Sequence, residues 1–236
     1  MTTMPFPARD YLPVLQELTG AFAARLRTGD PAAAVPDCAG WTLADLGTHL
    51  GNVHRWAATV VTTGEVQPQN FAADAGADLA SWYSEGAELL LDALGNAVPG
   101  DPCWHFGGTA KTKAFWFRRQ VHETAVHLAD SGSGHVLDPA VAADGVDEVL
   151  SALLPRVTRW HAVPRLPGPV SLRATDTGDV WTVHPGEPPA LGPAAGGATV
   201  EAPARALLLR LWKRTGPDVR TEGAAAAALL DAPLTP

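Results

Sequence analysis

A glutamate and a histidine lie four residues apart in a segment that is strongly compatible with a helix. They are Glu123 and His127, within the run FWFRRQVHETAVHLAD at positions 115–130. Four residues are little more than one helical turn, so the carboxylate and the imidazole lie on the same face and could bind one cation together. His122 lies roughly 140° around the helix from His127, at about 100° per residue, and is therefore not expected to join this pair.

The segment HETAVH does not match the zinc-protease motif. In HExxH the second histidine follows the glutamate by three residues, whereas here His127 follows Glu123 by four. A protease function is therefore set aside.

A transition-metal site needs at least a third protein ligand, and a catalytic site also keeps one coordination position open. His49 is the strongest candidate, because it lies on a predicted helix that should pack against the helix of Glu123 and His127. It shares a stripe with apolar residues, namely Leu46, Leu50, Val53 and Ala57. Spacing alone leaves open that His49 is a core histidine and that the Glu–His pair is an ordinary surface pair.

This set of donor atoms does not by itself select between zinc, nickel, cobalt and iron. Zinc is preferred for its softness, its geometry and its availability.

Four amphipathic helices are predicted to position these residues. Apolar residues at three- and four-residue steps predict helices over 10–26, 43–61, 79–94 and 115–130. Thr42 followed by Asp45 resembles a capping box at the start of the second helix. A shorter helix is predicted over 138–153, and the long loop 96–113 is typical of a binding element. We expect an antiparallel bundle with its site between the second and fourth helices.

The sequence pattern changes after residue 160, which predicts an α+β protein of two domains. The bundle is expected over 1–160, a Pro-rich linker over 161–169 and a small α+β domain over 170–236. In that domain VSLRAT and VWTVH predict a hairpin around a DTGD turn, and 190–197 predicts a surface loop. A strand at ATVEA, a helix over 203–214 and a last strand and helix complete it.

Composition excludes several classes of partner. The 236 residues are 46% hydrophobic, which is enough to bury a core, and the net charge of −8 gives no basic surface for nucleic acid. The two cysteines suggest no disulfide framework, and no signal peptide or apolar run of about 18 residues is recognisable. We expect a cytoplasmic protein with small-molecule partners and no membrane contact, either a monomer or a weak homo-oligomer.

Several motifs resemble one known family. The run at 115–130, with GWTLADLGTHL before it and AADGVDEVL after it, resembles the mycothiol-dependent maleylpyruvate isomerase family. RATDTGDVWTV and APARALLLRLWKR resemble the C-terminal domain of that family, which is similar to sterol-carrier folds. The resemblance covers the chain from about Ala8 to its end. It implies a DinB-like antiparallel four-helix bundle, and a metal held by His49, Glu123 and His127.

The resemblance also implies mycothiol as a thiol cosubstrate, with its sulfur at the open metal position. A divalent metal deprotonates a bound thiol, whereas a thiol with a pKa of about 8.5 is only a few per cent ionised at neutral pH. In an isomerase the thiolate adds to the cis double bond of a small unsaturated acid, the bond rotates and the thiolate leaves. Two alternatives stay open: a mycothiol S-transferase acting on electrophiles, and a non-catalytic metal- or ligand-binding module.

Basic residues near the motifs could bind the carboxylates of such a substrate. Arg214 is the better candidate clamp if the second domain folds over the mouth of the bundle, and Arg119 either binds substrate or pairs with Glu123 four residues later. Arg118 is expected to be solvated. Asp130 could accept the second N–H of His127 as an outer-shell partner, with capping or solvation near the helix end as the alternative.

Aromatic residues could form the wall of a thiol pocket, although tryptophan is more often a core residue. The candidates are Trp41, Trp104 and Trp116. His54 and His105 are assigned no role.

Overall fold

The computed structural model describes residues 6–69, 71, 76 and 78–236. They form two compact units. The described residues up to His105 belong to the first unit together with Ala110–His135, and Phe106–Thr109 belongs to the second with Val136–Pro236. Among the described residues, no helix combines the length and the apolar character that crossing a membrane requires.

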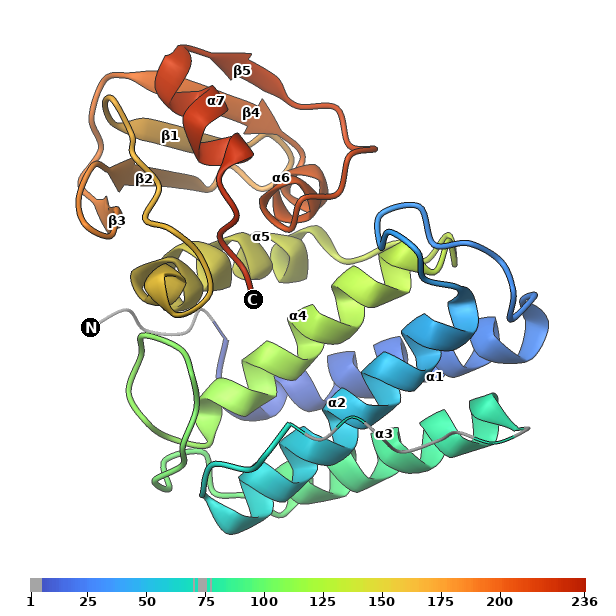
Figure 1. Ribbon diagram of the computed structural model, residues 1–236. Coiled ribbons are helices and arrows are strands. Elements are labelled where there is room, and N and C mark those ends of the chain that lie inside the picture. Colours follow the sequence, from blue (N-terminus) through green and yellow to red (C-terminus); the bar gives the residue numbers. More distant parts are fainter. Residues whose placement is uncertain (1–5, 70, 72–75, 77) are drawn as a thin grey trace. The chain divides into compact units, whose positions relative to one another are not determined.

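The first unit is a bundle of long helices (Figure 1). Its elements are α1 (Tyr11–Thr28), α2 (Leu43–Thr63), α3 (Leu79–Gly95) and α4 (Ala114–Asp130). Helix α1 packs against α3 and α4, and α2 packs against α3 and α4. The core contains large side chains with no exposed surface, among them Phe22, Leu46, Leu50, Tyr83 and Trp116. The predicted helical bundle is confirmed.

Helix α2 begins at a capping box, as the sequence predicts. The Thr42 hydroxyl accepts a hydrogen bond from the backbone N–H of Asp45 at 3.2 Å, and the Asp45 carboxylate accepts one from the backbone N–H of Thr42 at 2.8 Å. The helix ends at Gly64, whose φ of 75° lies in the left-handed region that glycine adopts without strain. These two signals fix the ends of the helix that carries His49.

The second unit combines helices with a mixed sheet, which confirms the α+β class. Helix α5 (Pro139–Glu148) continues into a π-helix, η2 (Val149–Leu153), and a 3-10 helix, η3 (Leu154–Arg159). The sheet order is β3-β2-β1-β4-β5, with β1 antiparallel to β2 and parallel to β4. The strands are β1 (Val170–Ala174), β2 (Val180–His184), β3 (Ala190–Gly192), β4 (Ala198–Ala202) and β5 (Arg220–Glu222). Helices α6 (Ala204–Leu211) and α7 (Ala224–Asp231) contact β1 and β4.

Two features of this unit differ from the sequence-based expectations. Residues 190–192 form strand β3, paired with β2, where the prediction was a loop. The Gly, Ala and Pro content of this segment hides a strand whose pairing partner is supplied by the fold. The segment 136–160 belongs to the second unit, where α5 packs against α6, rather than to the bundle range 1–160.

Candidate metal centre

Three predicted ligands meet between α2 and α4. The Nε2 atom of His49 lies 3.8 Å from Oε1 of Glu123, and Nε2 of His127 lies 3.3 Å from the same oxygen. One donor atom from each of the three residues lies within 4.8 Å of the others. The structure therefore brings together the two residues of one helix and the one of its neighbour that the sequence analysis singled out.

The spacing of these donor atoms fits a single divalent ion. Two nitrogen or oxygen donors that are each about 2.0–2.1 Å from a tetrahedral zinc ion lie about 3.3 Å apart. The His127–Glu123 distance of 3.3 Å already has this value, and the His49–Glu123 distance of 3.8 Å needs a movement of about half an ångström. Two imidazoles and a carboxylate leave a fourth position for an exogenous ligand.

The charge distribution of the site also suits a cation. Burial opposes ionisation of Glu123, but hydrogen bonds to His127 and His49 and the charges of His127 and Arg119 outweigh it and hold the carboxyl pKa well below its usual value. Burial likewise opposes a charged His127, but hydrogen bonds to Asp130, Cys38 and Glu123 raise the pKa of its imidazole above the ordinary value. The negatively charged surroundings that favour a proton on His127 would also favour a metal ion in place of that proton.

Two neighbouring residues orient the candidate ligands. The Arg119 guanidinium donates to Oε2 of Glu123 at 3.0 Å, and its side chain is only 3% exposed. The geometry therefore matches the structural alternative for Arg119, an i,i+4 pair with Glu123. Asp130 accepts from Nδ1 of His127 at 3.0 Å, so Nε2 is the nitrogen that faces Glu123 and could bind an ion once it has lost its proton.

Aromatic rings lie beside His49, which is partly exposed. The His49 side chain is 27% exposed, and its ring centroid lies 4.9 Å from that of Trp41 and 5.9 Å from that of Phe71. Trp104 and Trp116 instead contact Trp56. Of the three predicted tryptophans, Trp41 thus contacts a candidate ligand directly.

The sequence analysis missed two residues of this site. Phe71 borders His49 from the loop between α2 and α3, and Cys38 lies beside Asp130 with its sulfur 3.6 Å from Oδ2. Neither residue has a local pattern that would mark it, because each reaches the site from a loop.

Comparison with known proteins identifies the family. Residues 14–132 match the model of the mycothiol maleylpyruvate isomerase N-terminal domain, and residues 140–232 match that of the MDMPI C-terminal domain. The chain belongs to the mycothiol maleylpyruvate isomerase family.

Solved structures agree with this family in fold. A crystal structure of the mycothiol-dependent maleylpyruvate isomerase superposes with a TM-score of 0.67 at 13% identity, covering 100% of this chain and 99% of that one. A histidine-to-alanine mutant of that isomerase gives a TM-score of 0.66 with the same identity and coverage. No curated protein matches the chain.

The remaining predicted residues of this mycothiol maleylpyruvate isomerase family member are not among the three donors. Arg214 is in the second unit, where its guanidinium donates to the carbonyl of Trp212 at 2.7 Å. Arg118 is 4% exposed, so the expectation that it is solvated is wrong. His54 and His105 are buried, and neither is among the three donors.

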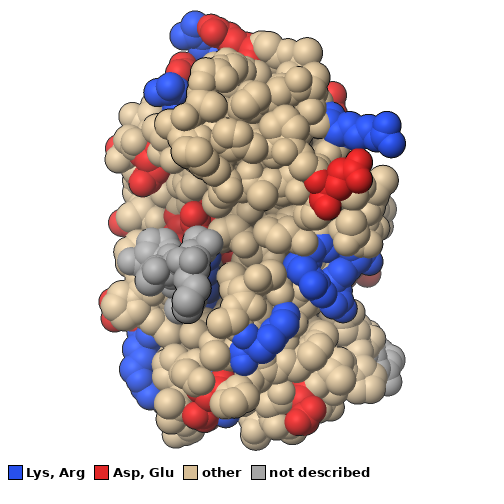
Figure 2. Space-filling model, turned by 90° about the vertical axis from the view of Figure 1, so that its left-hand side faces the viewer, with Lys and Arg blue, Asp and Glu red and all other residues tan. Residues whose placement is uncertain are grey.

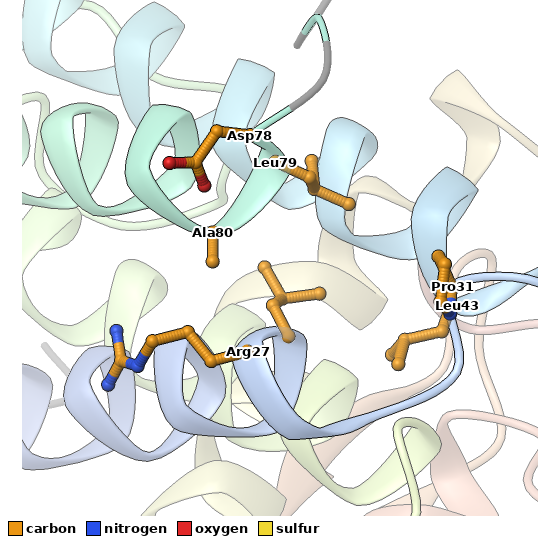
Figure 3. A pocket seen from close by; sticks show the side chains of 7 residues that line it. Arg27, Pro31, Leu43, Asp78, Leu79 and Ala80 are labelled. Atoms are coloured by element: carbon orange, nitrogen blue, oxygen red, sulfur yellow. The ribbon is translucent and has the colours of Figure 1, made fainter.

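A cavity in the first unit is separate from the candidate metal ligands. A cavity of about 280 Å³ is lined by Leu26, Arg27, Pro31, Leu43, Asp78, Leu79 and Ala80 (Figure 3). None of the three candidate metal ligands lines it, so the donor atoms and not this cavity define the candidate site. On the face shown in Figure 2, the described Lys and Arg residues lie in small groups beside acidic and uncharged residues, without a broad basic patch.

Proposed function

We propose that the chain is a divalent-metal-dependent enzyme that uses mycothiol to isomerise a small unsaturated acid about a cis double bond. One observation carries the proposal: His49, Glu123 and His127 converge from two helices within 4.8 Å, in a chain of the mycothiol maleylpyruvate isomerase family. The similar solved structures are described as a mycothiol-dependent maleylpyruvate isomerase, which supports the same reaction class.

Each residue of the centre has a defined task in this proposal. His49, Glu123 and His127 would hold the ion, and Arg119 and Asp130 would keep Glu123 and His127 in their binding orientation. When bound, a divalent ion such as zinc supplies a positive charge that ionises a thiol at neutral pH. The partly exposed side of His49, between Trp41 and Phe71, provides the approach for the thiol and the substrate.

The proposed reaction does not consume the thiol. The sulfur adds to one alkene carbon, the resulting single bond rotates, and elimination of the same sulfur restores the double bond in the trans configuration. Arg214 remains the predicted clamp for a substrate carboxylate. We place this chemistry in the cytoplasm, where thiols stay reduced.

A second candidate is mycothiol S-transfer to an apolar electrophile. It is favoured by the aromatic rings of Trp41 and Phe71 beside His49, and by the engagement of the Arg119 guanidinium with Glu123. In this reaction the thiol stays on the product, so each turnover removes one molecule of mycothiol.

The test combines metal analysis of the purified protein with two assays. Turnover of maleylpyruvate with constant mycothiol supports isomerisation, and loss of mycothiol with an electrophile supports transfer. A bound metal with neither activity would contradict both and would indicate a binding module. His49→Ala should lose metal and activity together, whereas His135→Ala, a control at a similarly exposed histidine of the same unit, should keep both.

A further inference from the structure

His127 has a second set of candidate ligands on its other side. The loop between α1 and α2 passes the C-terminal end of α4 (Figure 1), which brings Cys38 to Asp130. Oδ2 of Asp130 lies 3.6 Å from Sγ of Cys38 and 3.0 Å from Nδ1 of His127. One donor atom from each of Cys38, His127 and Asp130 lies within 4.8 Å of the others.

The distances between the donor atoms of this second set fit a tetrahedral ion at least as well as those of the first set. A sulfur about 2.3 Å and an oxygen about 2.0–2.1 Å from a tetrahedral zinc ion lie about 3.6 Å apart, and nitrogen and oxygen donors lie about 3.3 Å apart. The Cys38–Asp130 distance is 3.6 Å and the His127–Asp130 distance is 3.0 Å. Small side-chain movements are sufficient to seat an ion between these three atoms.

We propose that Cys38, Asp130 and His127 form an alternative metal site. Because this site shares His127 with the first site, the two sites cannot be occupied at the same time. A neutral imidazole offers one nitrogen lone pair and carries its proton on the other nitrogen. An ion at Nδ1 therefore moves that proton to Nε2, which can donate to Oε1 of Glu123 at 3.3 Å. Coordination of Cys38 releases the thiol proton to solvent.

The two sites differ in the ions that they favour. The first set offers two nitrogens and an oxygen, whereas the second offers a thiolate, which selects softer ions such as Zn²⁺ and Cd²⁺. The Asp130 side chain has no exposed surface, while Cys38 is partly exposed. The proposal requires neither mycothiol nor a substrate and is therefore independent of the proposed reaction.

The competing interpretation is that Cys38 only donates a hydrogen bond to Asp130, as a support for His127. Cobalt spectroscopy without any added thiol separates the two. The His49→Ala protein loaded with Co²⁺ alone should show a sulfur-to-cobalt charge-transfer band in the near ultraviolet. The band should vanish in His49→Ala/Cys38→Ser and persist in His49→Ala/Cys103→Ser, which alters the other, buried cysteine.

Cadmium affinity provides a second readout in the same proteins. Cys38→Ser should weaken Cd²⁺ binding to His49→Ala by more than about 100-fold, the upper end of what loss of a residue that only supports a ligand costs. Absence of the sulfur band in His49→Ala, or its persistence after Cys38→Ser, would overturn the proposal. Because these measurements use protein that lacks His49, their result does not depend on whether the first site or the isomerase activity exists.

Discussion

Glu123 is the residue on which the candidate centre most depends, because both of its carboxylate oxygens are engaged. Oε1 lies near the two histidine nitrogens, and Oε2 accepts from Arg119. A carboxylate held on one oxygen by a guanidinium can direct the other toward an ion without a large loss of side-chain entropy on binding. Arg119 thus acts on the ion through Glu123.

Replacing Arg119 with glutamine should therefore weaken metal binding. The expected loss is about 10–100-fold in affinity, the range for outer-shell partners. Competition with a chelating dye measures it, and Arg27→Gln, at an exposed arginine of α1, is the control. Unchanged metal affinity together with a raised KM for an acid substrate would instead support the substrate-binding role predicted from the sequence.

His54 makes stability depend on pH. Burial lowers the pKa of this histidine to about 3, below the usual 6.5, although the charge of Glu123 acts in the opposite direction. Nε2 lies 3.1 Å from the hydroxyl of Thr124, which donates to the carbonyl of Gln120, so Nε2 is the donor and Nδ1 carries no proton. The folded protein holds His54 neutral.

Between the two pKa values the unfolded state binds a proton at His54 that the folded state does not. The contribution of His54 to the free energy of unfolding is therefore fully present above about pH 6.5 and is lost as the pH decreases toward 3. Between pH 7 and pH 5.5 this loss is about 1 kcal/mol. Urea unfolding at several pH values measures the slope. His54→Gln, whose amide can replace the Nε2–H donor to Thr124, should have a shallower slope, and an unchanged slope would remove His54 as its cause.

At the scale of the elements, the position of His49 depends on how closely α2 packs against α3. A Cβ atom on Gly51 would lie 2.3 Å from a ring carbon of Trp82, and Arg55 lies over that ring at 3.9 Å from its centroid. The tryptophan is therefore not free to move away. Glycine at this position permits the approach of the two helices.

Gly51→Ala should destabilise the bundle. Forced overpacking costs about 1–3 kcal/mol, and in a chain of this size each kcal/mol lowers the melting temperature by about 2–4 °C. Gly20→Ala in α1 is the control, because a Cβ there meets no atom within 4 Å and alanine favours the helix. Thermal unfolding should show a loss for the first variant and none for the second. Equal melting temperatures would contradict the packing argument.

Helices were predictable from the sequence because their signals are local. Apolar periodicity and the Thr42 capping box place α2 and α4 to within a few residues, and the Glu123–His127 spacing follows from one helical turn. Strand β3 and the parallel pairing of β1 with β4 were not predicted, since pairing depends on segments that are distant in the sequence.

Side chains that reach the site from loops were not predictable for the same reason. Cys38 lies within a proline-containing loop that has no metal-binding spacing, and its contact with Asp130 spans 92 positions. Phe71 was likewise unmarked. The sequence supplied the His49, Glu123 and His127 set, while the residues around it required the packing of the bundle.

At the scale of the whole molecule, the candidate centre belongs to one of the two units. All three donors lie in the first unit, and the two family models, over 14–132 and 140–232, meet close to the boundary between the units. Metal binding is therefore expected to stabilise the first unit directly.

Adding zinc should raise the melting temperature of the protein. An ion that binds only the folded state, at 100 times its Kd, contributes about 2.7 kcal/mol. Calorimetry should show the increase, and a chelator should reverse it. Glu123→Gln removes the carboxylate charge beside His49 and His127 and should therefore lose most of the increase in melting temperature. Glu17→Gln, in α1, should retain it. A full increase in Glu123→Gln would place the stabilising ion elsewhere.

The most direct test of the metal centre is anomalous diffraction at the zinc edge from crystals grown with zinc and mycothiol. The account predicts one strong peak at about 2.0–2.1 Å from the nearest donor atoms of His49, Glu123 and His127, with the thiol sulfur at about 2.3 Å. A peak bound by other residues, or none near these three, would contradict it.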